Sequence, residues 1–101
     1  MTWTTEGRKV NPLAGALLAD TGPLGIGGSM NFVIIGSSTV VGFAVLQLRD
    51  SNNQTTIAEQ YIDLGNATNM KFENMAFGDS QRFRIVVDLA IVGSVQAGIF
   101  Y

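Results

Sequence analysis

The carboxylates are the residues of this chain that could carry out acid–base chemistry. The sequence contains no histidine and no cysteine, so it lacks the commonest general base, the commonest metal ligand and the best nucleophile. Glu59 and Asp63 are the closest pair expected on one strand face, but four residues at about 3.3 Å each separate them by roughly 13 Å. Inverting glycosidases hold their two carboxyl groups only about 6.5 to 9.5 Å apart. We therefore expect no catalytic residues and no enzymatic activity.

Two loop-like stretches could hold a ligand through their backbone. Residues 22–28, Gly-Pro-Leu-Gly-Ile-Gly-Gly, superficially resemble a phosphate loop, but the lysine and the following helix that such a loop requires are missing. Residues 50–53, Asp-Ser-Asn-Asn, supply only part of the dense oxygen run that calcium needs. Turns explain both stretches more simply, so we expect no cofactor and no metal.

Aromatic rings are the other candidates for binding. Trp3, Tyr61 and Tyr101 could line a sugar-binding platform, because flat rings with one polar edge suit recognition in water. Trp3 lies near the N-terminus, where a large ring is costly to leave exposed, so we expect it to dock on a neighbouring subunit. The phenylalanines are expected to fill the core instead: Phe32, Phe43, Phe72 and Phe83.

The composition describes one domain with a weakly charged surface. A chain of 101 residues suits a single core that buries roughly 60 to 70% of the unfolded surface. Charged residues make up 14% of the chain, against about 25% in typical soluble domains. A surface this bland is often covered by a partner or by copies of the same chain.

Charge and hydropathy exclude several classes of partner. The net charge is −2 and the six basic residues form no run, which argues against nucleic-acid binding. The longest apolar run, residues 40–48, is far shorter than the roughly 20 residues of a membrane-spanning helix. Residues 1–10 are polar and contain Glu6, so we expect no secretory signal.

Short apolar runs that end in turn residues predict strands, and no helix of useful length is expected. The runs cover residues 30–35, 40–48, 57–64, 69–77, 83–89 and 95–101, a spacing typical of an antiparallel sandwich or barrel. Gly42 inside its run indicates a bulge or a close approach of the backbone. In residues 82–89, Arg82, Arg84 and Asp88 oppose Phe83, Ile85, Val87 and Leu89, which predicts one buried face.

Residues 1–28 differ from the rest, because they are rich in Gly, Thr and small residues and contain both prolines. We interpret them as an N-terminal arm with one weak strand at residues 13–20, for which a short helix is the alternative, followed by the main domain at 29–101. Because no core pattern lies in residues 1–11, deleting them is expected to leave the fold intact.

Three stretches carry a resemblance to a known family. They are residues 28–38, Gly-Ser-Met-Asn-Phe-Val-Ile-Ile-Gly-Ser-Ser; residues 45–50, Val-Leu-Gln-Leu-Arg-Asp; and residues 77–85, Phe-Gly-Asp-Ser-Gln-Arg-Phe-Arg-Ile. The chain from residue 28 to 101 resembles the capsid decoration, or cement, proteins of tailed bacteriophages. The resemblance implies a compact antiparallel β-sandwich, of jelly-roll or other Greek-key type, that is often trimeric and sits on the outer capsid surface.

The resemblance also implies partners and a location. We expect a homotrimer that binds the major capsid protein and stabilises the capsid, made in the host cytoplasm and carried on the virion. The residues expected to contact neighbours belong to the N-terminal arm: Trp3, Arg8, Lys9, Val10, Pro12 and Leu13. Two alternatives stay open, a tail or head-fibre component and a small carbohydrate-binding β-module.

Overall fold

The computed structural model describes residues 2–38, 42–65 and 70–101. Within these residues there are eleven strands and no helix, so the prediction of an all-β fold is confirmed. The described residues contain no helix long and apolar enough to cross a membrane. The strands are β1 (Trp3–Thr4), β2 (Lys9–Val10), β3 (Leu17–Asp20), β4 (Gly28–Ser29), β5 (Phe32–Ser37), β6 (Phe43–Arg49), β7 (Thr56–Asp63), β8 (Met70–Glu73), β9 (Ala76–Phe77), β10 (Arg82–Val87) and β11 (Ser94–Phe100).

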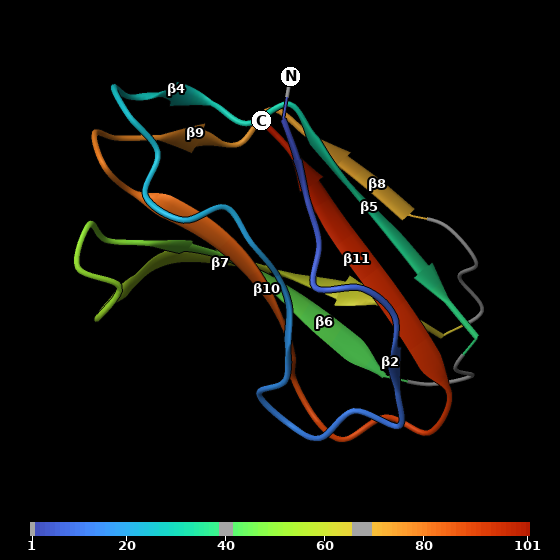
Figure 1. Ribbon diagram of the computed structural model, residues 1–101. Helices are drawn as coiled ribbons and strands as arrows, with labels where there is room; N and C mark the ends of the chain where they lie inside the picture. The colour runs from blue at the N-terminus through green and yellow to red at the C-terminus, as the bar shows by residue number, and fades with distance from the viewer. Residues whose placement is uncertain (1, 39–41, 66–69) are drawn as a thin grey trace.

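The described strands form two main antiparallel sheets and one short two-stranded sheet. The five-stranded sheet has the order β1-β11-β5-β8, with β2 also paired to β11, and the four-stranded sheet has the order β3-β10-β6-β7. Strands β4 and β9 pair only with each other. Figure 1 shows β5, β8 and β11 as one layer on the right and β6, β7 and β10 on the left.

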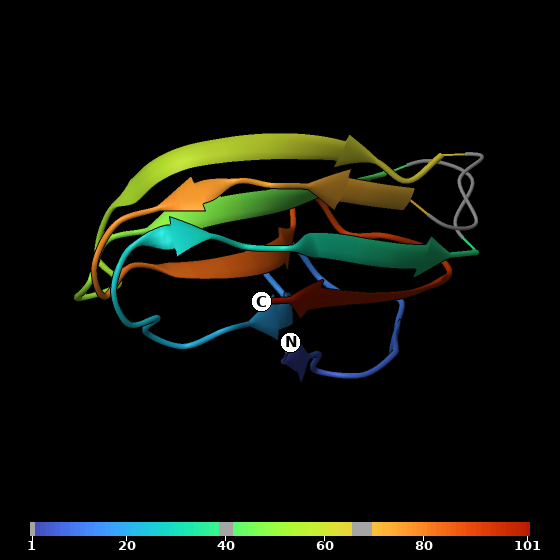
Figure 2. The same cartoon turned by 90° about the horizontal axis from the view of Figure 1, so that it is seen from above.

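The strand pairs are nested along the chain. Trp3 pairs with Phe100 at the outermost end, and Asp20 pairs with Arg84 further in. Strand β4 then pairs with β9, β5 pairs with β8, and β6 pairs with β7. The chain is therefore one long antiparallel ribbon that is closed by the turn between β6 and β7. Both chain ends lie side by side at the open end of this ribbon (Figures 1 and 2).

One core lies between the two sheets, because strand residues alternate between its two faces. The five-stranded sheet contributes side chains such as Val33, Ile35 and Ile99, and the four-stranded sheet contributes Leu46 and Phe83, among others. Figure 2 shows the strands of both layers running along the length of the molecule. The burial of these apolar side chains is the main favourable term in folding.

The structure corrects the predicted environment of two phenylalanines. Phe83 is fully buried as expected, and the side chain of Phe72 lies outside the described part. Phe43 is 41% exposed, because Ala44, Leu46 and Leu48 are the inward residues of β6. Phe32 is only half buried, since Val33 and Ile35 occupy the inward positions of β5.

Most predicted strands are present with shifted ends. The strand predicted at residues 40–48 corresponds to β6, which begins at Phe43 and ends at Arg49. Residues 39–41 lie outside the described part. Residues 69–77 are divided into β8 and β9 around Asn74, which has a positive φ of 60°. Strand β10 ends at Val87, and Leu89 is exposed instead of facing the core. The close approach at Gly42 is confirmed, because a Cβ there would lie 3.2 Å from the Ile91 side chain.

Residues 2–28 are built into the sheets and do not extend away as the expected arm would. Strands β1 and β2 pair with β11, and β3 is the edge strand of the four-stranded sheet. Within this segment Leu18 and Ala19 are completely buried. The physical reason is that the edge of β11 opposite β5 would otherwise be open, and β1 and β2 pair with it and satisfy its backbone groups.

Candidate interaction surfaces

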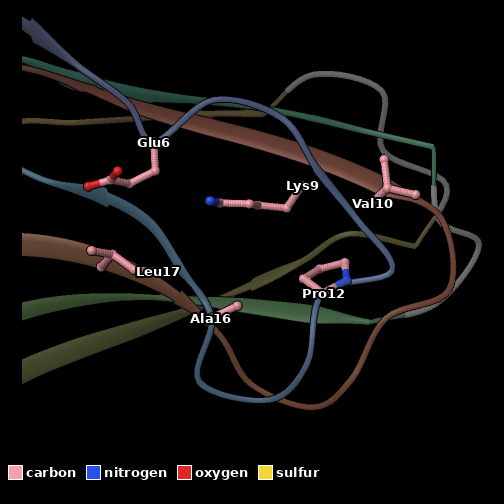
Figure 3. Close-up of a pocket in the computed structure, with 6 residues that line it drawn as sticks. All are labelled: Glu6, Lys9, Val10, Pro12, Ala16 and Leu17. Atoms are coloured by element: carbon pink, nitrogen blue, oxygen red, sulfur yellow. The ribbon is translucent and has the colours of Figure 1, made fainter.

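The six residues expected to contact neighbours do not form one surface. Lys9, Val10 and Pro12 line a hollow of about 320 Å³ together with Glu6, Ala16 and Leu17. Figure 3 shows the Lys9 side chain reaching across this hollow, between the segment that carries Glu6 and the chain that leads into β3. Arg8 lines a separate hollow with residues of β5 and β11.

Val10, the last residue of β2, and Leu13, in the loop after it, are exposed apolar residues next to a second loop. The loop after β2 and the loop after β10 are joined by backbone hydrogen bonds, from Asn11 N to Gly93 O at 2.7 Å and from Ile91 N to Pro12 O at 3.0 Å. Figure 1 shows these loops together at the lower end of the molecule. We call the four exposed side chains there the apolar tip: Val10, Leu13, Leu89 and Val92, which are 69 to 85% exposed.

The apolar tip is the strongest sign of a binding surface. Single exposed apolar residues are ordinary, but several gathered on neighbouring loops mark a surface that another molecule covers. The sequence interpretation missed Leu89 and Val92, because it placed Leu89 on the buried face of a strand and left Val92 between two predicted strands. The uninterrupted run Leu-Ala-Ile-Val at residues 89–92 was the available signal.

Trp3 lies on the outer face of the five-stranded sheet. Its ring centroid is 4.3 Å from that of Phe100, which in turn is 4.5 Å from that of Phe32. The indole covers Gly98, since a Cβ at Gly98 would clash with the ring. Trp3 nevertheless stays 43% exposed, so this row of three rings, on β1, β11 and β5, is partly open to solvent.

A second apolar area lies on the outer face of the four-stranded sheet. Tyr61 and Phe43 are 54% and 41% exposed, and their rings meet edge to face with centroids 6.4 Å apart. Val45 lies opposite Tyr61 in the sheet and is only 3% exposed, although it is not part of the central core. The exposed aromatic pair therefore shields a buried valine on the outside of the sheet.

The three rings expected for a sugar platform are not brought together. Trp3 belongs to the five-stranded sheet and Tyr61 to the four-stranded sheet. Tyr101 is half buried against the core, and its hydroxyl donates to Thr21 O at 3.4 Å. Trp3, Tyr61 and Tyr101 thus lack the shared exposed plane that would favour a carbohydrate-binding module.

Three of the carboxylates, those of Asp50, Glu59 and Asp63, hold local structure. Asp63 accepts a hydrogen bond from Gly65 N at 2.8 Å, and Glu59 accepts one from the Gln47 amide at 3.4 Å. At Asp50 burial raises the pKa, but hydrogen bonds from the backbone of Gln54 and Thr55 and the charge of Arg49 outweigh it, so the pKa lies below its ordinary value. These contacts hold turns and the edge of the sheet.

No protein-family model, no curated protein and no solved structure matches this chain.

Proposed function

We propose that this chain is a structural virion protein that decorates the outer surface of a bacteriophage capsid and stabilises it. The resemblance of residues 28–101 to capsid decoration proteins motivates the proposal, and the apolar tip is the observation that carries it. A protein that works by attachment needs an exposed surface that becomes buried on its partner. The major capsid protein is the partner proposed for the tip.

We also propose that the two sheets form a β-sandwich of the jelly-roll type. Taking β1 with β2 as the first strand and passing over the short pair β4 and β9, the main strands number eight. Their order is first, eighth, third, sixth in one sheet and second, seventh, fourth, fifth in the other. An antiparallel ribbon rolled into two sheets has this order, and jelly rolls recur in viral capsid and lectin domains.

Self-association into a trimer belongs to the same proposal. A further apolar area, the row of rings around Trp3 on the five-stranded sheet, is partly exposed, and symmetric contacts between copies would cover such an area. Light scattering at several concentrations tests this part. A mass near three times 10.8 kDa is expected, and a monomer at every concentration would overturn the trimer.

Capsid attachment is tested by replacing the apolar tip. Capsids assembled without this chain would be incubated with the wild-type protein or with the variant Val10→Ser, Leu13→Ser, Leu89→Ser and Val92→Ser, then pelleted. We expect the variant to lose at least tenfold in affinity, because the apolar area that binding removes from water is gone.

Ile26→Ser is the matched control for the tip variant. Ile26 is 88% exposed but lies next to the turn that precedes β10, where Ser80 N donates to Gly25 O, whereas the tip follows the end of β10. The control should bind like the wild type. Equal binding of all three proteins would overturn the role of the tip, and no binding by the wild type would overturn capsid decoration itself.

A further inference from the structure

Three of the six basic residues of the chain gather on the outer face of the four-stranded sheet. Arg82 on β10 lies directly opposite Arg49 on β6, and Arg84 follows two residues along β10 on the same face. Like charges directly opposite each other destabilise a sheet. In a chain with a net charge of −2, this concentration of positive charge is unexpected.

Two of the three guanidinium groups are each held by more than one hydrogen bond. Arg82 donates from Nε and Nη2 to the two carboxylate oxygens of Asp20, at 3.1 and 2.9 Å. Arg49 donates to the side chain and the backbone carbonyl of Asn53, at 3.0 and 2.7 Å, and to Thr56 Oγ1 at 2.5 Å. Arg82 thus ties β10 to β3, and Arg49 holds the turn between β6 and β7.

Arg84 has capacity left for a ligand. Its Nε donates to Gln47 Oε1 at 2.6 Å, and within the described residues its two terminal nitrogens donate to no other group. Burial, Arg49 and Arg82 lower the pKa of Arg84, while Asp20 raises it. The Gln47 amide also donates to Glu59, which fixes the glutamine and, through it, the guanidinium.

An apolar row lies directly beside this cation. Val86, two residues beyond Arg84, is opposite Val45, and Val45 is opposite Tyr61. Two residues along a strand correspond to roughly 7 Å. A ligand that reaches from Arg84 to this row would therefore present one anionic group and one apolar group at that spacing.

We propose that this face binds an acidic peptide segment of a protein partner, with a carboxylate of the peptide on Arg84 and an apolar side chain on Val86 and Tyr61. The forked guanidinium matches the two oxygens of a carboxylate. In the same row across the sheet, Asp20 lies next to Arg84 on one side, and Glu59 lies beyond Gln47 on the other. These two carboxylates repel a chain of repeated negative charges such as nucleic acid. An isolated carboxylate between two neutral residues avoids this repulsion.

The spacing defines the probe. In an extended peptide, residues two apart share a face, so the probe is acetyl-Leu-Thr-Glu-Thr-amide and its control is acetyl-Leu-Thr-Gln-Thr-amide. Titration into ¹⁵N-labelled protein, followed by NMR, should show the Glu peptide binding at least tenfold more tightly. The signals of Arg84 Nε–H and of Tyr61 should shift.

Variants locate the binding. Arg84→Gln should reduce the affinity for the Glu peptide to that for the Gln peptide, and Arg84→Lys should recover only part of it, because an ammonium lacks the fork. Arg8→Gln removes an exposed arginine that lies by the other sheet and should change nothing. The comparison of the two peptides on the wild-type protein needs no variant, so it holds even if a variant fails to fold.

Three results would overturn the proposal, which does not depend on capsid decoration. The first is equal affinity for the Glu and Gln peptides. The second is inorganic phosphate binding more tightly than the Glu peptide, which would make the cluster a general anion site. The third is loss of self-association in Arg84→Gln by light scattering, which would make a second copy of this chain the occupant.

Discussion

The indole of Trp3 covers the Cα of Gly98 on the neighbouring strand, and no other residue at position 98 leaves room for it. Gly98 lies on the outer face of β11 between Gln96 and Phe100, opposite Ile34 of β5. An aromatic ring that packs over a glycine in an adjacent strand protects the backbone there and helps to fix the register. The first residues of the chain are thereby attached near its last residues.

Gly98→Ala should displace the indole and destabilise the protein. The added methyl group would occupy the space of the ring, and overpacking of this kind typically costs about 1 to 3 kcal/mol. Because Trp3 is the sole tryptophan, its fluorescence reports the displacement directly, and urea unfolding gives the change in free energy.

A double-mutant cycle with Trp3→Ala is the control for this prediction. In the Trp3→Ala background, Gly98→Ala should have a much smaller effect, since the clash is absent. An equal loss of unfolding free energy in both backgrounds would show that Gly98 stabilises the fold for a reason other than the space it leaves for the indole.

Deletion of residues 1–11 should weaken the fold, contrary to the expectation from sequence. The deletion removes both strands that cover one edge of β11 and the hydrogen bond from Thr5 Oγ1 to Ala97 O at 2.6 Å. An open edge also pairs readily with other chains. We expect a lower urea midpoint and concentration-dependent aggregation by light scattering, and an unchanged midpoint would contradict this reading.

Alternation within strands was predictable from sequence because it depends only on local geometry. The pattern Phe83, Ile85 and Val87 marked the buried face of β10 correctly, whereas Leu89, which follows the end of the strand, is exposed. The period of two along a strand is enough to find such residues.

Long-range pairing was not predictable in the same way. Residues 2–28 carry weak alternation, and their place in the sheets depends on the free edges of β10 and β11, which no local pattern describes. The candidate surfaces show the same limit. Val10 and Leu13 were named from the sequence as contact residues, whereas Leu89 and Val92 come near them only because the two loops are hydrogen-bonded across the fold.

Phe83→Ala should be among the most destabilising single substitutions. Phe83 is fully buried and meets the ring of Phe77 edge to face, with centroids 5.8 Å apart. Removing such a side chain typically costs about 3 to 5 kcal/mol, since it leaves a cavity. Phe43→Ala deletes the same side chain from an exposed position on the outer face, so its effect on the urea midpoint should be clearly smaller. Similar losses for the two variants would refute this assignment of inner and outer faces.

The Asp50 carboxylate should make the turn between β6 and β7 sensitive to acid. Its Oδ1 accepts hydrogen bonds from Gln54 N at 2.8 Å and Thr55 N at 3.2 Å. Because the pKa of Asp50 in the folded protein lies below the ordinary value of 3.8, the carboxylate stabilises the fold above that value. This contribution is lost as the pH falls below 3.8 through the lower pKa of the folded state.

Asp50→Asn keeps an acceptor oxygen at this turn but cannot titrate, which makes it the variant of choice. It should unfold at a lower temperature than the wild type at pH 7, because a charged acceptor binds the two amides more strongly than a neutral one. Below pH 3.8 the difference between the two proteins should shrink, since the wild-type carboxyl becomes protonated. Melting temperatures measured by circular dichroism from pH 7 to pH 2.5 test this convergence, and Asp88→Asn, after the end of β10, controls for the loss of one negative charge. A constant difference across this range would mean that the ionised carboxylate does not stabilise the turn.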